Sequence, residues 1–363
     1  MMKGLTIIWF CAVLLAVPAR GIDVTEEQVH QFGLDEVETP DAAKELLPDI
    51  SPTSPGDWQE NLGELLNGGL SRSGGFVREA VRTAASMLAV ALLCSMVTQM
   101  EEKRSQDAVL LAGTLAIALL GVGGFRSMVA LGRETLGELR SFSMLLLPAL
   151  TAASAASGSV AGGGAVYAAS IVVSDVLTTL IDKLLIPLLY AFLAISTANA
   201  VLREQNLTML RDWIKRLLTS GLKLTVFAFT AYISLSGVIS GAGDAAAVRA
   251  AKLALSAAVP VVGGMISDAS ETVLVSARMI KTGAGAFGMA AVLAICLLPL
   301  IRLGVQHLIL KLTAALCETV TEKPLSGMID SVSDALGFLM AMTAAAGFML
   351  LISCVSFLKV AGV

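Results

Sequence analysis

Long stretches without a charged residue dominate the hydrophobic pattern of this chain. A helix needs about 20 apolar residues to cross the hydrocarbon core of a bilayer, within a range of about 17–25. Six of the stretches suit one crossing each, and 141–174 is long enough for two. The seven stretches are 83–100, 108–125, 141–174, 184–202, 224–243, 282–301 and 335–358. The pattern predicts an all-α, polytopic integral membrane protein with about eight transmembrane helices.

Composition supports a membrane protein over a soluble one. Hydrophobic residues make up 56% of the chain, charged residues only 15%, and the mean hydropathy is +0.80. A soluble domain has about 25% charged residues. Alternating apolar and polar strands of the kind that build a membrane barrel are absent from the sequence. Helices are therefore the structure that satisfies the backbone hydrogen bonds in lipid.

The first 75 residues differ from the rest. Residues 1–19 have a basic start, a short apolar core and small residues at Val17 and Ala19, which predicts a signal peptide cleaved after Ala19. An uncleaved first anchor is the alternative. Residues 20–75 hold twelve acidic and three basic residues with four prolines, which indicates an exported acidic, largely irregular segment. Residues 76–363 form the predicted multi-helix membrane domain.

Two features predict how the membrane helices connect. Glycines between 158 and 164 predict a hairpin of helices at about 141–157 and 161–181. The stretch 203–216 has four basic residues and Trp213, so the positive-inside rule places it in the cytoplasm. With eight crossings, Arg126, Arg133 and Arg140 then fall on the outer side, against that rule.

One segment is apolar but too short to cross. The run 253–267 would make a helix of about 22 Å, and Pro260 with Gly263 and Gly264 breaks it. We expect a short re-entrant or interfacial segment, with a bent surface helix as the alternative. The residues of this expected functional segment are Lys252, Pro260, Gly263, Gly264, Ser267, Asp268 and Glu271.

Charged residues inside or at the edge of apolar spans are the other candidate functional residues. They are Asp175, Asp182, Lys183 and Lys223. Charge within a membrane is costly and often marks a pathway for ions or substrates. Asp175 is the best single candidate for an intramembrane polar residue, because it lies inside the second helix of the expected hairpin.

Short motifs give weak support for catalysis or cofactor binding. Residues 283–288 match GxGxxG, but no strand precedes them. Asp244 ends a GxGD string typical of intramembrane aspartyl peptidases, and such chemistry needs a second aspartate such as Asp175 or Asp182. Two histidines and five cysteines without a CxxC pair offer no metal site. We expect no enzyme activity, no cofactor and no nucleic-acid partner. Small-residue spacing such as Gly237/Gly241 allows a homo-oligomer.

The most specific string runs from Lys252 to Asp268. It reads KLALSAAVPVVGGMISD and is similar to the K-x-A-x-S-x-x-V-P-V-V-G-G-x-x-S-D signature of the stage III sporulation protein AE family. The flanking SLSG at 234–237 and ICLLP at 295–299 agree with that resemblance, which extends over about 80–360.

The resemblance implies a role in endospore formation. It implies residence in the mother-cell membrane that surrounds the forespore, and a permease-like or scaffold subunit of a multiprotein channel or secretion-like complex. The implied partners are the other stage III sporulation A-operon membrane proteins, an ATPase among them, and indirectly the forespore stage II sporulation Q protein. A self-contained secondary transporter and an intramembrane aspartyl peptidase are the alternatives.

Overall fold

The protein is an elongated bundle of long helices. The computed structural model describes residues 37–48, 50–51, 58–100, 103–156, 164, 167–168, 170–172, 175–176, 179–202, 206–231 and 263–359. These residues are almost entirely helical and include no strand, which confirms the all-α prediction for this part of the chain. The expected signal peptide at 1–19 lies outside the described residues.

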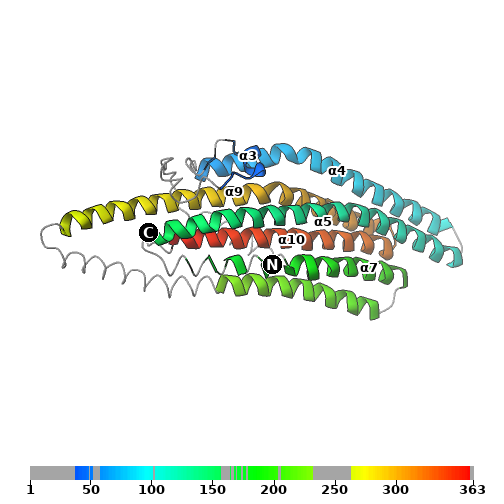
Figure 1. Ribbon diagram of the computed structural model, residues 1–363. Coiled ribbons are helices and arrows are strands. Elements are labelled where there is room, and N and C mark those ends of the chain that lie inside the picture. The colour runs from blue at the N-terminus through cyan, green and yellow to red at the C-terminus, as the bar shows by residue number, and fades with distance from the viewer. Residues whose placement is uncertain are drawn as a thin grey trace.

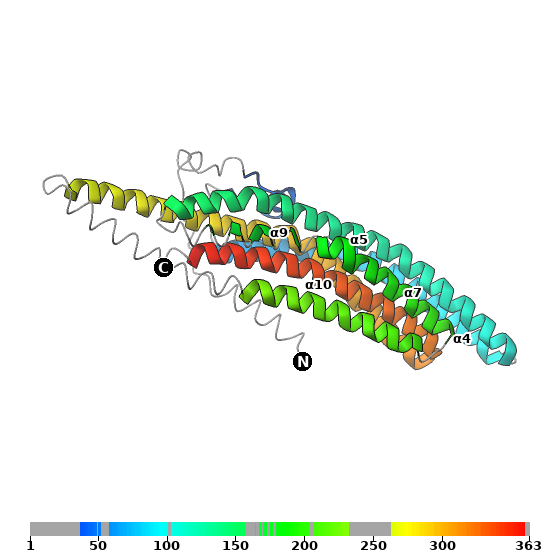
Figure 2. The same cartoon turned by 60° about the horizontal axis from the view of Figure 1, so that its bottom comes forward.

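Two helical hairpins form most of the bundle. α4 (Trp58–Met100) and α5 (Lys103–Ala156) are the first pair, and α9 (Gly263–Val320) and α10 (Lys323–Lys359) are the second. Figures 1 and 2 show the four helices running side by side. The Ser95 hydroxyl of α4 donates a hydrogen bond to the Val320 carbonyl of α9 at 3.1 Å. The connections of both hairpins therefore lie at the same end of the bundle.

The helices are much longer than one membrane crossing, and this corrects the sequence prediction. α5 has 54 residues, so it is about 80 Å long at 1.5 Å per residue, against a hydrocarbon core of about 30 Å. It joins the expected spans 108–125 and 141–157 in one helix. The charged stretch between them, 126–140, contains no proline and does not end the helix.

Five helices among the described residues are long and apolar enough to cross a membrane, fewer than the eight expected. They are Asn61–Thr98, Gln106–Ala156, Ile181–Leu202, Thr282–Val320 and Lys323–Leu358. Part of the difference comes from the merging of two expected spans in α5. The expected span 224–243 also lies mostly outside the described residues, which resume at Gly263.

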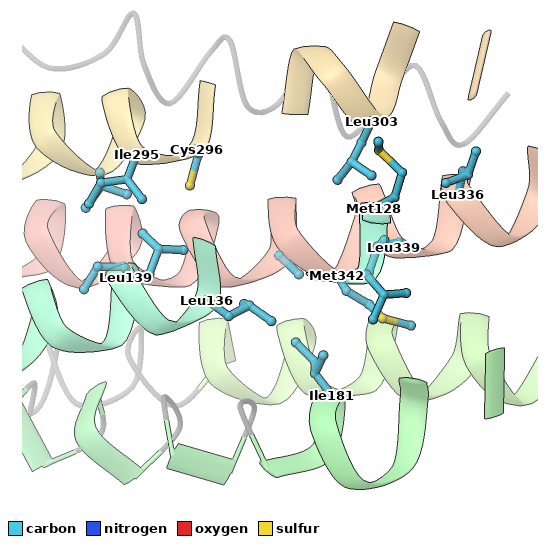
Figure 3. Packing of buried hydrophobic residues seen from close by; sticks show 14 of the residues in the cluster. Met128, Leu136, Leu139, Ile181, Ile295, Cys296, Leu303, Leu336, Leu339 and Met342 are labelled. Carbon is cyan, nitrogen blue, oxygen red and sulfur yellow. The ribbon is translucent and has the colours of Figure 1, made fainter. Parts of the chain in front are cut away.

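The remaining helices pack along the side of α5 and α10. α7 (Ile186–Leu202) follows the π-helix η1 (Ile181–Leu185), and a further helix covers 206–231. The core between these elements is mainly apolar, with some buried serines and threonines. Figure 3 shows Ile181 pointing towards Leu136 of α5 and Met342 of α10. Phe192 of α7 meets Phe338 of α10 edge-to-face, with ring centroids 6.3 Å apart. Burial of this apolar surface against neighbouring helices holds α7 in place.

The parts of the acidic N-terminal segment that the structure describes are largely helical. Within 20–75, Asp41–Leu46 forms α3 and α4 begins at Trp58, where irregular chain was expected. α3 packs on α9 and α4, with Ala43 and Leu47 almost fully buried. α4 also continues through Gly68 and Gly69. These glycines allow close packing, because a Cβ at Gly69 would lie 2.8 Å from Ile301 Cδ1 of α9.

One ion pair joins α3 to α4, and we expect it to contribute modestly to the stability of α3 on the bundle. Arg72 Nη2 lies 3.2 Å from a Glu45 carboxylate oxygen and 3.3 Å from the Glu45 carbonyl oxygen. The side chains are 38% and 55% exposed, so the pair is worth at most about 1 kcal/mol. Arg72→Ala should speed hydrogen exchange in 41–47 by up to about fivefold. Lys44→Ala, which removes only an exposed contact with Asp41 at 3.6 Å, is the control. Unchanged exchange in the Arg72 variant would contradict the prediction.

Candidate functional site

The expected re-entrant segment falls at the edge of the described structure. Lys252 and Pro260 lie outside the described residues. Gly263 and Gly264 are the first residues of α9, and the backbone at Ser267, Asp268 and Glu271 continues the same helix. The side chains of these residues are not part of the description. The re-entrant segment stays a prediction, and its two glycines are the first two residues of α9.

The structure brings Asp175 together with an arginine that the sequence analysis placed on the outer side of the membrane. Arg140 Nη2 of α5 donates to Asp175 Oδ1 at 2.7 Å. Seven residues away on each helix, Arg133 Nε donates to Asp182 Oδ1 at 3.0 Å. We call these four residues the charged seam. The equal spacing of seven residues places each pair about two helical turns from the other on one face.

Asp182 of the charged seam lies in the π-helix η1. Pro187 supplies a physical cause, since its ring cannot donate to the carbonyl of residue 183 and would clash with it in a regular α-helix. The wider turn keeps Ile181 and Leu185 buried at 0% and 2% exposure. Asp182, the residue after Ile181, is 42% exposed and faces Arg133 of α5. π-turns within helices often occur at functional sites.

The charged seam lies level with an uncharged stretch of α10. A Cβ at Gly132 would be 3.1 Å from Leu339, and one at Gly288 would be 2.5 Å from Leu146 and 3.4 Å from Cys354. The section of α5 that carries Arg133 and Arg140 therefore runs beside residues 339–354 of α10. Residues 339–354 of α10 belong to the uncharged stretch 335–358. If α10 crosses the membrane through this stretch, the four charges lie within the membrane.

A second polar cluster joins three helices near the connection between α9 and α10. Lys311 Nζ of α9 lies 2.6 Å from Asp330 Oδ1 and 3.1 Å from Asp334 Oδ1 of α10. The Lys215 ammonium, from the helix at 206–231, donates to the other oxygen of Asp334. We call these four residues the ionic node. Asp334 is its most buried member, with 14% of its side chain exposed.

His307 lies beside the ionic node and is used for packing. Its Nδ1 is 2.7 Å from the Ser333 carbonyl oxygen, which can only accept, so Nδ1 carries the hydrogen. The Ser333 hydroxyl in turn donates to the His307 carbonyl at 2.9 Å. The ring covers Gly337, where a Cβ would meet His307 Cε1 at 3.0 Å. These contacts fasten α9 to α10.

The glycine string at 283–288 also serves packing. Gly285 and Gly288 lie within α9, and a Cβ at Gly285 would be 2.7 Å from Leu358 of α10. Within the described residues no group of three or more His, Cys, Asp or Glu could hold a metal ion. Asp175 and Asp182 each pair with an arginine, and Asp244 lies outside the description.

The sequence alone did not reveal that the residues of the charged seam, or those of the ionic node, lie together. The sequence analysis placed Arg133 and Arg140 on the outer side of the membrane, between two expected spans. The signal that could have found them is the spacing of seven shared by two arginines and two aspartates. The ionic node had a weaker signal, because Asp330 and Asp334 share a helix face but Lys215 is far away in the sequence.

Comparisons with known proteins point to one family. The family model described as stage III sporulation protein AE matches residues 46–361. A relative from Bacillus subtilis (strain 168), described as "Stage III sporulation protein AE", is 23% identical over 239 residues. That alignment covers 66% of this chain and 60% of the relative, so the chain matches less than two thirds of the relative's length. No solved structure matches the chain.

Proposed function

Because this chain belongs to the stage III sporulation protein AE family, we propose that it is a membrane subunit of a multiprotein sporulation complex. It serves as a permease-like or scaffold subunit of a channel or secretion-like complex between mother cell and forespore. Its place is the mother-cell membrane around the forespore, which it crosses several times. The role is structural or conductive, and it needs no catalytic residue of its own.

The observation that carries this proposal is the exposure of the charged seam. The seam side chains are 41–60% exposed on the surface of the single chain, yet they lie beside the apolar part of α10. Charged side chains in a bilayer face protein or a water-filled cavity, because contact with lipid is costly. A chain that leaves such a face uncovered is expected to work against further protein or around an aqueous passage.

The proposed partners are other membrane proteins of the stage III sporulation A operon and an ATPase, with the forespore stage II sporulation Q protein reached indirectly. The chain has no GxxxxGK[ST] phosphate-binding loop. Work driven by ATP through this complex would therefore come from the ATPase partner. The lipid bilayer covers the remaining apolar faces, where residues such as Leu93, Leu119 and Phe227 are 63–75% exposed.

Purification of the tagged full chain from sporulating cells in mild detergent tests this function. We expect the proposed partners to co-purify. The double variant Arg140→Leu, Asp175→Leu should reach the membrane at normal abundance. Most of the partner proteins should no longer co-purify with it, and the number of spores formed should fall at least tenfold. The matched control removes the Arg211–Asp212 pair, whose two members lie on one helix 3.1 Å apart. Transport by the purified chain alone in vesicles, with no partner recovered, would instead favour a self-contained secondary transporter.

A further inference from the structure

The charged seam, which the described residues leave 41–60% exposed, has a regular arrangement of charge. α5 contributes only positive members, Arg133 and Arg140, and the neighbouring helical stretch contributes only negative members, Asp175 and Asp182. One arginine and one aspartate stand side by side at each of two levels, about 10 Å apart along the bundle. Seen face-on, the seam has one positive edge and one negative edge.

We infer that a second copy of this chain covers the charged seam, in a parallel pair related by a two-fold axis along the bundle. This inference rests on the proposed role as a complex subunit and names the partner at this face. Two copies inserted in one membrane share the same orientation, so residues of equal number lie at equal depth. The isologous contact of a two-fold pair then joins the same patch on both copies.

The charge pattern of the seam is complementary to itself under that rotation. The two-fold axis exchanges the two edges, so the positive edge of one copy faces the negative edge of the other. Arg133 and Asp182 of both copies make a four-charge group at one level, and Arg140 and Asp175 make another. Each aspartate gains a second arginine, and the charged groups leave the lipid, where exposure of a charge is costly.

Gly137 supplies a second, independent observation at the same face. It lies midway between Arg133 and Arg140, is exposed, and has nothing within 4 Å of the position of a Cβ. Packing against the residues that the structure describes therefore does not require glycine here. In membranes, small residues at a helix surface allow another helix to approach closely. Met144 and Val172, which are 53% and 60% exposed, border the same face with apolar side chains.

Two differently tagged copies of the full chain provide the test. They are produced together in a bacterium that makes none of the other sporulation proteins, and one tag is used for purification in mild detergent. We expect the second tag to co-purify. Met144→Cys in one copy and Val172→Cys in the other, in a background without the native cysteines, should give a cross-linked pair, whereas Leu93→Cys on α4, 63% exposed, combined with Val172→Cys should not.

A charge-swapped chain makes the test specific for this face. It carries Arg133→Asp, Arg140→Asp, Asp175→Arg and Asp182→Arg, so the pairs within each copy are kept. Swapped copies should associate with each other. Swapped and wild-type copies should associate at least tenfold less, because their like-charged edges face each other. Equal recovery of all three combinations would overturn the inference.

Gly137→Leu tests the close approach without disturbing the single chain. It should reduce co-purification of the second tag at least tenfold at unchanged abundance, and Gly124→Leu, also with nothing within 4 Å of its Cβ, should not. Absence of self-association in the wild type would also overturn the inference. In that case, recovery of other proteins from sporulating cells would still support the proposed function and assign the seam to one of them.

Discussion

Gly121→Leu should destabilise the folded bundle by about 3 kcal/mol or more, the upper part of the range for overpacked cores. Gly121 lies on the face of α5 that packs against α10. A Cβ there would be 2.6 Å from Val332 Cγ2 and 3.2 Å from Val332 Cγ1. Val332 is 1% exposed, and its β-branched side chain has one strongly preferred rotamer in a helix. The clash therefore has to move α10 away from α5.

Gly124→Leu is the matched control, since it changes the same helix three residues away. Nothing lies within 4 Å of a Cβ at Gly124, and leucine favours a helix over glycine by up to about 1 kcal/mol. The control variant should be as stable as the wild type or slightly more stable. Apparent melting temperature in detergent and abundance in the membrane provide the measurements. Equal behaviour of the two variants would show that α5 and α10 do not pack at Gly121.

Asp334→Asn should release the helix at 206–231 from the α9–α10 hairpin. The change leaves Lys215 without the carboxylate partner described for it and Lys311 with Asp330 alone. Breaking a fully buried ion pair costs about 3–5 kcal/mol and an exposed one about 1 kcal/mol or less. Asp334 is 14% exposed but both lysines are 46% exposed. We therefore expect Asp334→Asn to weaken the attachment of the helix at 206–231 by about 2 kcal/mol.

Hydrogen exchange measured by mass spectrometry locates the effect of Asp334→Asn. Exchange in 206–231 should become at least tenfold faster, because the ionic node holds this helix through Lys215. Asp330→Asn is the control, since Asp330 pairs only with Lys311 in the described contacts and is 44% exposed. Asp330→Asn should leave hydrogen exchange in 206–231 almost unchanged. Similar acceleration in both variants would mean that the helix is held by its apolar face alone.

The N-terminal half of the bundle shows where hydrophobic pattern misleads. Arg126, Arg133 and Arg140 interrupt the apolar run of α5, and a span-by-span reading places a loop at such charges. A helix ends where its backbone is broken, and 126–140 contains neither proline nor a turn signal. The charges are accommodated because Asp175 and Asp182 neutralise two of them from the neighbouring helix. That pairing is a contact between distant parts of the chain, which a local pattern cannot reveal.

The sequence alone determined that this is a helical membrane protein and which family it resembles. Both follow from local information, namely long uncharged runs and the string Lys252–Asp268, and the family model confirms the second. Only the tertiary structure decided which charges meet, because the partners in the charged seam and the ionic node are 19 to 119 residues apart, as in the pairs Lys311–Asp330 and Lys215–Asp334. It also decided which glycines are needed. Gly121 and Gly137 look alike in the sequence, but among the described residues only Gly121 has a neighbouring helix against the position of its Cβ.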